Sequence, residues 1–358
     1  MENPFRIHQP NRTINNISHQ ADQPLAGIIN NNPMLRKTKK VKISVSPNIS
    51  ISPKKSEIRK DYFMDRYVII TPSRAARPHD VREEAVIHTG KECVFCGKNI
   101  KKLQKIKKEY FAGREKIIAI ANKFPAVTED NPKAYGVHEV IIDTLAHNKE
   151  IGELPINQIQ NLLDVYADRT LEISRNKKIE YVLVFKNSGG KAGASLLHAH
   201  SQVFASKISP PDVQEELKIA HAYQIKNGVC PYCKIIKDEE KSPRKIYADE
   251  NIIAIAPYAS QFHYEAWIFP RRHLDNIILL KPAERNSLAK ALKQILSKLN
   301  SINLSYNLFL HDAVKDKNQH FYLKIQPREA IFAGLELGSG IVINSISPEV
   351  ATKFYRAK

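Results

Sequence analysis

The strongest constraint on this chain is an internal repeat that spans most of its 358 residues. Four short segments recur in the same order, each displaced by roughly 120 to 140 residues. A recurrence that keeps both the order and the approximate spacing of its landmarks indicates one structural unit built twice. The matched segments are CVFC (93–96) with CPYC (230–233), EKIIAIA (115–121) with ENIIAIA (250–256), HEVIIDTLAH (138–147) with YEAWIFPRRH (264–273), and HAHSQ (198–202) with HFYLK (320–324).

Each copy also contains one amphipathic helix between its strands. Segments 155–176 and 282–300 have a proline near the start and apolar residues at three- and four-residue steps, which is typical of helices. Apolar runs with the character of strands follow both segments. We therefore predict an α+β fold with antiparallel sheets flanked by helices, in two tandem domains at 57–210 and 211–358.

Residues 1–56 precede the repeat and are rich in Asn, Pro, Ser and Lys, with little apolar periodicity. We expect them to form a disordered or loosely attached basic extension. The chain opens without the apolar core of a signal peptide, and none of its apolar runs approaches the ~18 residues of a membrane span. A cytoplasmic protein without a membrane segment is the expectation.

The formal net charge of +18 raises the question of a nucleic-acid ligand. Much of the positive charge lies in two lysine-rich segments, 35–42 and 98–108. Neither segment interleaves aromatic residues with its lysines, as binders of single-stranded nucleic acid do. A phosphorylated small substrate is the preferred interpretation of the charge.

All four cysteines fall in the two Cys-x-x-Cys pairs, and each pair is followed by histidines that also repeat. In a chain without a secretion signal, this arrangement favours metal binding over disulfides. Two Cys and two His are a common tetrahedral zinc set, and four protein ligands leave no open position for a catalytic water. We predict two structural zinc sites, with ligands Cys93, Cys96, His147 and His198 in the first half and Cys230, Cys233, His273 and His320 in the second.

The segment HAHSQ places His198, His200 and Gln202 at alternate positions, so on a strand they share one face. The second half keeps the outer histidine as His320 but has Tyr322 in place of His200. A role needed in both halves does not predict that difference, whereas a catalytic role needed once does. Imidazole can attack phosphorus, and the amide of Gln202 can donate to the phosphoryl oxygen as charge builds.

The glycine-rich segment KNSGGKAGAS (186–195) lies just upstream of these residues. Its backbone N–H groups, including that of Gly193, can cradle a phosphate, and Asn187 and Ser195 add side-chain donors. The same glycines also suit a simple hairpin turn. Because the segment adjoins His200, the phosphate role is preferred.

These motifs resemble the histidine triad superfamily, and within it the duplicated branch of the galactose-1-phosphate uridylyltransferases. The resemblance covers about 57–355 and rests on DRYVIITPSRAARP (65–78), ANKFPAV (121–127) and FKNSGGKAGASLLHAHSQ (185–202). The C-terminal segment from 320 to 351 is similar also to the related ADP-glucose phosphorylases. Two histidine-triad-like domains, each with a zinc site, are the fold that this resemblance implies.

The resemblance implies a ping-pong mechanism in which His200 holds a nucleoside monophosphate covalently. It places Arg74 and Arg77 at phosphates, although Arg77 also suits a solvated turn, and Asn122 and Phe124 at the base or ribose. Nucleotide sugars and sugar 1-phosphates are the implied substrates, and a homodimer is the implied assembly.

Three other functions remain open at this stage. The sequence does not identify the base or the sugar, so an ADP-sugar phosphorylase is the close alternative to a UDP-glucose:hexose-1-phosphate uridylyltransferase. A histidine-triad nucleotide hydrolase is disfavoured by Gln202, since such hydrolases typically carry a third histidine there. A zinc-stabilised nucleic-acid-binding protein is the non-enzyme alternative. The motif also has Ala199 and Ser201 where the family has proline and glycine.

Overall fold

The computed structural model of the chain describes residues 56–76, 93–100, 106–112, 115–312, 316 and 318–357. The predicted extension, apart from Ser56, lies outside the described residues, and so does Arg77. In the described part of the chain, no helix has the length and apolar composition needed to cross a membrane.

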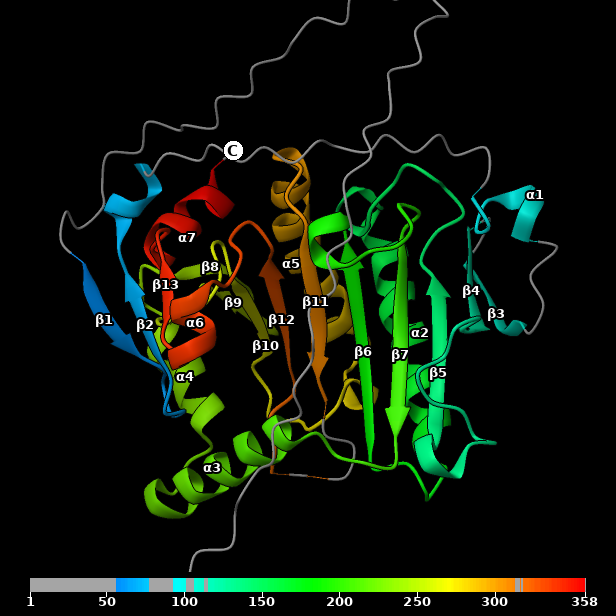
Figure 1. Ribbon diagram of the computed structural model, residues 1–358, viewed down its shortest axis with the longest axis horizontal. Coiled ribbons are helices and arrows are strands. Elements are labelled where there is room, and N and C mark those ends of the chain that lie inside the picture. The colour runs from blue at the N-terminus through cyan, green and yellow to red at the C-terminus, as the bar shows by residue number, and fades with distance from the viewer. Residues whose placement is uncertain are drawn as a thin grey trace, which may run out of the picture. The chain divides into compact units, whose positions relative to one another are not determined.

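A ten-stranded antiparallel sheet forms the centre of this fold (Figure 1). From one edge to the middle the strands follow the order β3-β4-β5-β7-β6, and from the other edge they follow the corresponding order β8-β9-β10-β12-β11. The two halves join where β6 pairs with β11. The strands are β3 (Ile106–Ala112), β4 (Glu115–Ala121), β5 (Gly136–Ile142), β6 (Tyr181–Ser188), β7 (His200–Ser206), β8 (Lys245–Ala248), β9 (Ile252–Ile255), β10 (Ala266–Pro270), β11 (Tyr306–His311) and β12 (Tyr322–Pro327).

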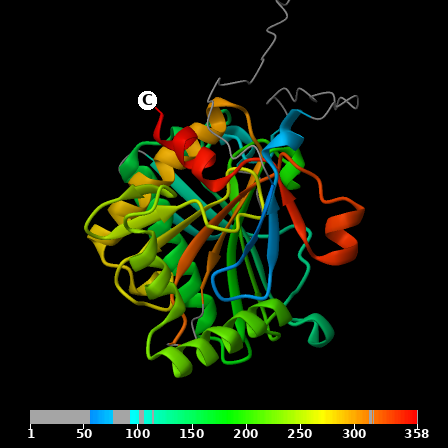
Figure 2. The ribbon, with the colours of Figure 1, turned by 90° about the vertical axis from the view of Figure 1, so that its left-hand side faces the viewer.

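Two long helices, α2 (Ile156–Ser174) and α5 (Pro282–Ser301), cover one face of this sheet, as Figure 2 shows from the side. Both occupy the segments predicted as helices. Their apolar residues at three- and four-residue steps, such as Ile159, Leu162 and Tyr166, are buried in one core that draws on both halves. The prediction of an antiparallel sheet flanked by helices is confirmed.

The opposite face is covered by shorter elements. Helix α1 (Gly97–Ile100) follows the first cysteine pair, and α3 (Pro211–Asn227) and α4 (Pro231–Glu239) lie over the second half (Figure 1). A three-stranded sheet and two helices complete the described chain. They are β1 (Glu57–Lys60), β2 (Tyr67–Ile70), β13 (Val342–Asn344), α6 (Gly334–Ser339) and α7 (Pro348–Arg356). Single 3₁₀ turns occur at η1 (Pro72–Ala76), η3 (Pro132–Ala134), η4 (Ile151–Glu153), η5 (Gly190–Ala192) and η6 (Ile277–Leu279).

Two details differ from the sequence-based expectations. Strand β7 begins at His200, so His198 precedes the strand instead of lying within it. Helix α3 was not predicted, because its buried residues are few and its apolar residues form no clear stripe. The boundary predicted at residue 210 falls between β7 and α3, and the division into two domains stays a prediction.

Candidate active site and metal centres

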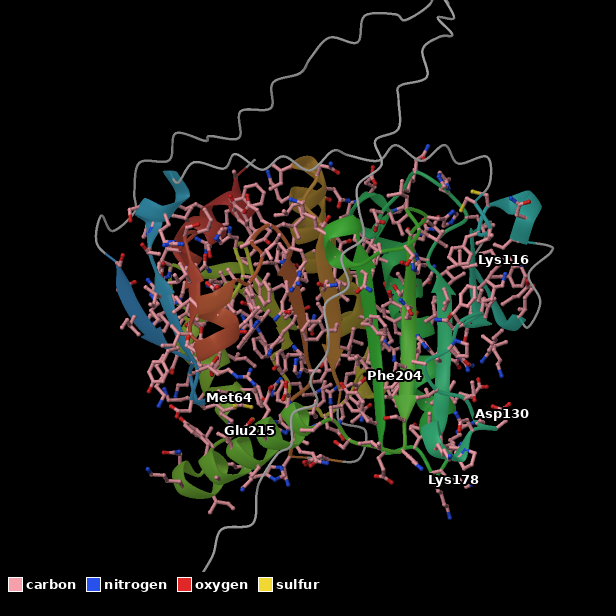
Figure 3. The ribbon with its side chains drawn as sticks, in the orientation of Figure 1. Met64, Lys116, Asp130, Lys178, Phe204 and Glu215 are labelled. Carbon is pink, nitrogen blue, oxygen red and sulfur yellow. The ribbon has the colours of Figure 1, made fainter. Side chains whose placement is uncertain are left out.

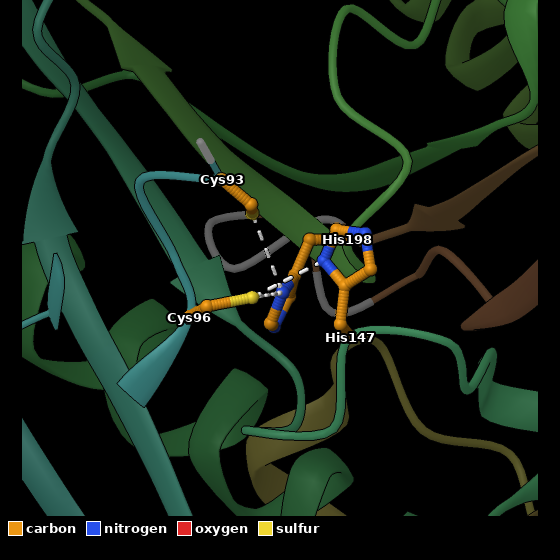
Figure 4. Close-up of side chains that lie close together, drawn as sticks. All are labelled: Cys93, Cys96, His147 and His198. Carbon is orange, nitrogen blue, oxygen red and sulfur yellow. Dashed lines mark hydrogen bonds between the residues drawn. The ribbon is translucent and has the colours of Figure 1, made fainter. Parts of the chain in front are cut away.

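The four predicted ligands of the first half converge from three parts of the chain (Figure 4). Cys93 and Cys96 lie before α1, His147 follows β5, and His198 precedes β7. The Cys96 Sγ atom lies 3.2 Å from His147 Nδ1 and 3.6 Å from His198 Nδ1. The Cys93 Sγ atom also lies 3.6 Å from His198 Nδ1.

These separations match the edges of a tetrahedron around a zinc ion. Zinc–sulfur bonds of ~2.3 Å and zinc–nitrogen bonds of ~2.0–2.1 Å imply ligand–ligand edges of about 3.3–3.8 Å. All the ligand atoms in each group lie within 4.8 Å of one another. The residues of the cluster therefore fit a four-coordinate metal.

The buried His198 ring is held in the orientation that a ligand needs. Its Nε2–H donates to the backbone oxygen of Thr144 at 2.7 Å, so Nδ1 carries the lone pair and faces the cysteines. Burial lowers the pKa of His198, which favours the neutral ring that binds metal.

The second half repeats this cluster with Cys230, Cys233, His273 and His320. The Cys233 Sγ atom lies 3.4 Å from His273 Nδ1 and 3.5 Å from His320 Nδ1. His320 Nε2–H donates to the backbone oxygen of Pro270 at 2.9 Å. Pro270 lies three residues before the ligand His273, just as Thr144 lies three residues before the ligand His147. Hydrogen bonds, first from Cys233 and then from His320, lower the pKa of the Cys230 thiol. Both predicted ligand sets are thus able to hold a metal ion.

The buried His200 ring lies beside the first cluster, and its two nitrogens differ in their hydrogen bonding. Its Nδ1 lies 2.8 Å from the backbone oxygen of His198. A carbonyl oxygen only accepts hydrogen bonds, so Nδ1 carries the proton and Nε2 keeps its lone pair in the neutral ring. The ring of Phe95, from the metal-binding loop, lies 5.6 Å from the His200 ring between centroids. The arrangement supplies an oriented nucleophilic nitrogen.

A buried lysine that the sequence analysis missed fixes the backbone of His200. Lys186 Nζ donates to the His200 backbone oxygen at 3.2 Å and lies 3.1 Å from carboxylate oxygens of both Asp143 and Glu150. Burial opposes its charge, but the carboxylates of Glu150 and Asp143 outweigh burial and raise the pKa of Lys186. The sequence position of Lys186 could have indicated its burial, because it alternates with Val182 and Val184 on the buried side of β6.

Gln202 has its carbonyl oxygen occupied by two neighbours, one of which is the unpredicted His138. The backbone N–H of Ala126 donates to His138 Nδ1 at 3.1 Å, so His138 Nε2 carries the proton and donates to Gln202 Oε1 at 2.9 Å. Asn122 Nδ2 lies 3.4 Å from the same oxygen. Gln202 is therefore oriented with its amide NH₂ group as the remaining donor, which is the role predicted for it.

The glycine-rich segment forms a tight loop between β6 and His198. Gly189 and Gly193 both adopt φ of +82°, a region that side chains disfavour. Asn307 of β11 donates its amide to Asn187 Oδ1 at 2.8 Å and to the backbone oxygen of Ala192 at 2.9 Å. The Asn187 oxygen is thus occupied, so its NH₂ group is the donor that remains, as for Gln202. Ser195 is exposed in the same loop.

The other predicted substrate contacts lie at different distances from this centre. Phe124 is 80% exposed, and its backbone N–H donates to Asn122 Oδ1 at 2.9 Å, so it borders the group around Gln202. Arg74 lies exposed in η1 after β2, which Figure 1 shows well away from β7. The structure of this chain does not bring Arg74 together with His200.

Known proteins share this architecture. A family model described as galactose-1-phosphate uridyl transferase, N-terminal domain, matches residues 130–210. The chain is 25% identical to a galactose-1-phosphate uridylyltransferase of Thermotoga maritima, over 84% of this chain and 98% of that relative. It is 28% identical to an ADP-glucose phosphorylase of Arabidopsis thaliana, over 86% of this chain and 94% of that relative. The solved structure of an Arabidopsis thaliana ADP-glucose phosphorylase with bound ADP-glucose matches with a TM-score of 0.75 and 28% identity, covering 85% of this chain and 99% of that one.

The resemblance predicted from the motifs is confirmed by these matches. The similarity extends over nearly the whole length of each relative, and the family-model match includes His147, His198, His200 and Gln202. The prediction that the chain resembles enzymes of the transferase class is likewise confirmed.

Proposed function

We propose that this chain transfers a nucleoside monophosphate between a nucleotide sugar and a sugar 1-phosphate, using His200 as a covalent nucleophile. UDP-glucose and a hexose 1-phosphate such as galactose 1-phosphate are the proposed substrates. The observation that carries the proposal is the hydrogen bond from His200 Nδ1 to the His198 backbone oxygen, because it leaves Nε2 as the nucleophilic atom. The similarity to the galactose-1-phosphate uridylyltransferase of Thermotoga maritima supports the choice of substrates.

The reaction proceeds in two displacements at the α-phosphorus. The lone pair of His200 Nε2 attacks phosphorus, an N–P bond forms, and the P–O bond to the sugar 1-phosphate breaks with the electron pair leaving on oxygen. The phosphate oxygen of a second sugar 1-phosphate then attacks the same phosphorus and releases His200. Each step exchanges one bond for another, so no oxidant or external reductant is required.

The groups around His200 stabilise the charge that builds on the phosphoryl oxygens. The amide of Gln202 and the amide of Asn187 supply side-chain donors whose own oxygens are already occupied. Backbone N–H groups of the loop at 189–195, with the hydroxyl of Ser195, supply the rest. Asn122 and Phe124 are proposed to contact the ribose or base, and Arg74 and Arg77 to contact phosphates.

We further propose that both Cys/His clusters hold structural zinc. Zinc would cross-link the loops around each cluster and thereby fix the start of β7 and of β12. The two Cys/His sets suit zinc because both sulfur and imidazole ligands are present in the tetrahedral arrangement described above. Two histidine-triad-like domains, a homodimeric assembly and a cytoplasmic location remain predictions from the motifs and the resemblance.

An ADP-glucose phosphorylase is the second candidate function. In that reaction inorganic phosphate, not a sugar 1-phosphate, would take the nucleotide from His200. The Arabidopsis thaliana structure with bound ADP-glucose supports it, since its TM-score with this chain is 0.75. Both candidates use the same nucleophile and differ in the nucleotide that His200 carries and in the acceptor that removes it.

Intact-protein mass spectrometry after a brief incubation with UDP-glucose or ADP-glucose tests both candidates. We expect a uridylyl adduct with UDP-glucose that is absent from the His200→Ala variant and retained in a matched control, His221→Ala on α3. An adenylyl adduct instead would assign the chain to the phosphorylase reaction. The proposal fails if neither nucleotide sugar gives a His200-dependent adduct.

A further inference from the structure

The second half contains a cavity at the position that corresponds to the His200 site. In the first half Phe185 lies opposite Gln202, and in the second half Phe309 lies opposite Lys324. A cavity of about 380 Å³, lined by Lys324 and Phe309 among others, opens there. This volume lies within the ~300–1,000 Å³ that small-molecule sites occupy.

Figure 3 shows where one of the residues that line the cavity lies. Met64, which lines the cavity, and Glu215 of α3 are labelled near the second-half strands, whereas Phe204 marks β7 of the first half. The residues that line the cavity include neither His200 nor Gln202.

Two cations line this cavity without a salt-bridge partner in the described part of the chain. The Lys324 side chain is 8% exposed, and its Nζ lies 4.8 Å from the ring centroid of Trp267 and 5.2 Å from that of Tyr322. Arg66 lines the cavity from the segment before β2. No carboxylate among the described residues forms a salt bridge with either side chain, so their N–H groups are available to an anion.

The carboxylates that line the cavity are occupied by the protein itself. Glu216 Oε1 accepts the hydroxyls of Tyr232 and Tyr322, each at 2.6 Å. Burial alone would raise the pKa of Glu216, but the nearby Lys324 charge and these hydroxyls lower it to about 2. Glu216 is therefore ionised at neutral pH, and it interacts electrostatically with Lys324 without forming a salt bridge.

Three further carboxylates line the cavity, those of Asp61, Asp212 and Glu265, and Asp212 lies in the first turn of α3. Glu265 accepts Trp267 Nε1–H at 2.8 Å and two backbone N–H groups, and burial raises its pKa. Asp61 Oδ1 accepts the backbone N–H groups of Phe63 and Met64. Asp61 and Glu265 thus accept from neutral local donors, and neither forms a salt bridge with Lys324 or Arg66.

We propose that this cavity binds a small molecule that joins a flat aromatic ring to an anionic group, of the class of nucleoside 5′-monophosphates. Lys324 and Arg66 would hold the anion, and the rings of Phe63, Phe309 and Trp267 would contact the base. No reaction is expected at this site, because Tyr322 replaces His200 and donates its hydroxyl to Glu216. It is a second ligand site, independent of the proposed transfer reaction.

Trp267 is the sole tryptophan in the sequence, so its fluorescence reports on this cavity directly. The full-length His200→Ala protein is titrated with AMP and with UMP, which removes covalent transfer from the signal. We expect a saturable fluorescence change with at least one of them, and binding of adenosine or uridine weaker by at least about tenfold because the anion is missing. Inorganic phosphate alone is expected to bind weakly for the converse reason.

The matched variants are Lys324→Met and Lys353→Met, the second an exposed lysine on α7. Lys324→Met should weaken nucleotide binding by at least about tenfold, and Lys353→Met should leave it unchanged. The inference is overturned if wild-type protein shows no saturable response, if nucleosides or phosphate alone bind as well as nucleotides, or if Lys324→Met binds normally. An adduct at His200 with no Trp267 response would refute this inference alone, and the reverse result would refute the proposed function alone.

Discussion

In the first half of the sheet His200 and Gln202 follow the metal ligands, and in the second half Tyr322 and Lys324 stand at the matching places. The second of the two residues between the paired cysteines also differs. It is Phe95 in the first half, with its ring centroid 5.6 Å from that of His200, and Tyr232 in the second half, with its ring centroid 5.2 Å from that of Tyr322. The metal clusters and the carbonyls that orient their histidines are retained in both halves. The repeat has therefore kept its cross-links and diverged in the chemistry beside them.

The partners of the two central side chains account for this divergence. His200 turns one nitrogen to a backbone carbonyl and keeps the other available, whereas the Tyr322 hydroxyl donates to the buried Glu216. Glu216 comes from α3, which has no counterpart before the first metal cluster within the described residues. The connecting segment between the halves thus supplies the carboxylate that accepts the Tyr322 hydroxyl.

One apparent match of the repeat has a different explanation. Glu139 and Glu265 both stand eight residues before a metal-ligand histidine, but they face opposite sides of the sheet. Glu139 forms a buried ion pair with Arg169 of α2, with two nitrogen–oxygen distances of 2.8 Å. Glu265 instead lines the second-half cavity. A one-residue difference in register moves a strand residue to the other face, so the shared glutamate is a coincidence of sequence.

The largest effect is expected from His200, which the second half replaces with Tyr322. His200→Ala should lower nucleotidyl transfer by about 10⁴-fold or more, because it removes the nitrogen proposed to attack phosphorus. Steady-state transfer assays measure this, with circular dichroism to verify folding. Activity of His200→Ala within tenfold of the wild type would remove the distinction between the halves.

Loss of either metal cluster should destabilise the fold. We expect Cys93→Ala and Cys230→Ala each to release one equivalent of zinc and to lower the free energy of unfolding by on the order of 5 kcal/mol or more. Metal analysis and chemical denaturation measure the two effects. Cys93→Ala should also disturb the His200 site through Phe95, so residual folded Cys230→Ala should be the more active of the two. Equal activity of the two variants would show that the clusters do not differ in this way.

Lys186→Met should cost about 3–5 kcal/mol of stability, because it leaves Asp143 and Glu150 without their shared cation. Transfer should also slow, since the His200 backbone oxygen loses its donor. A matched change at Lys290, an exposed lysine of α5, is expected to leave stability within about 0.5 kcal/mol of the wild type. A stable and fully active Lys186→Met protein would contradict the role assigned to this lysine.

The smallest expected effect tests whether the second half supports the site of the first. Asn307→Ala removes the donor that holds Asn187 and the loop at Ala192, so kcat should fall by about tenfold with little change in folding. Asn286→Ala on α5, which contacts Gln160 at 3.1 Å, is the matched control and should retain kcat. Unchanged kcat in Asn307→Ala would mean that the first half positions its loop unaided.

Residue type and spacing were sufficient to predict the repeat, the helices α2 and α5, both metal-ligand sets, and the group around His200 and Gln202. Each of these leaves a local trace, such as an apolar period, a Cys-x-x-Cys pair, or a histidine present in one copy and replaced in the other. Comparison of two copies within one chain supplied the discrimination that a single motif lacks.

The remaining contacts became visible only once the strands were ordered. Lys186 meets Asp143 because β6 and β5 flank β7, and Asn307 meets Asn187 because the halves join at β6 and β11. The contact between Tyr322 and Glu216 likewise depends on α3, because the two residues are 106 positions apart along the chain. Local patterns identify which side chains are chemically able to act, but sheet order and register decide which of them meet, because pairs this distant in sequence share no local signal.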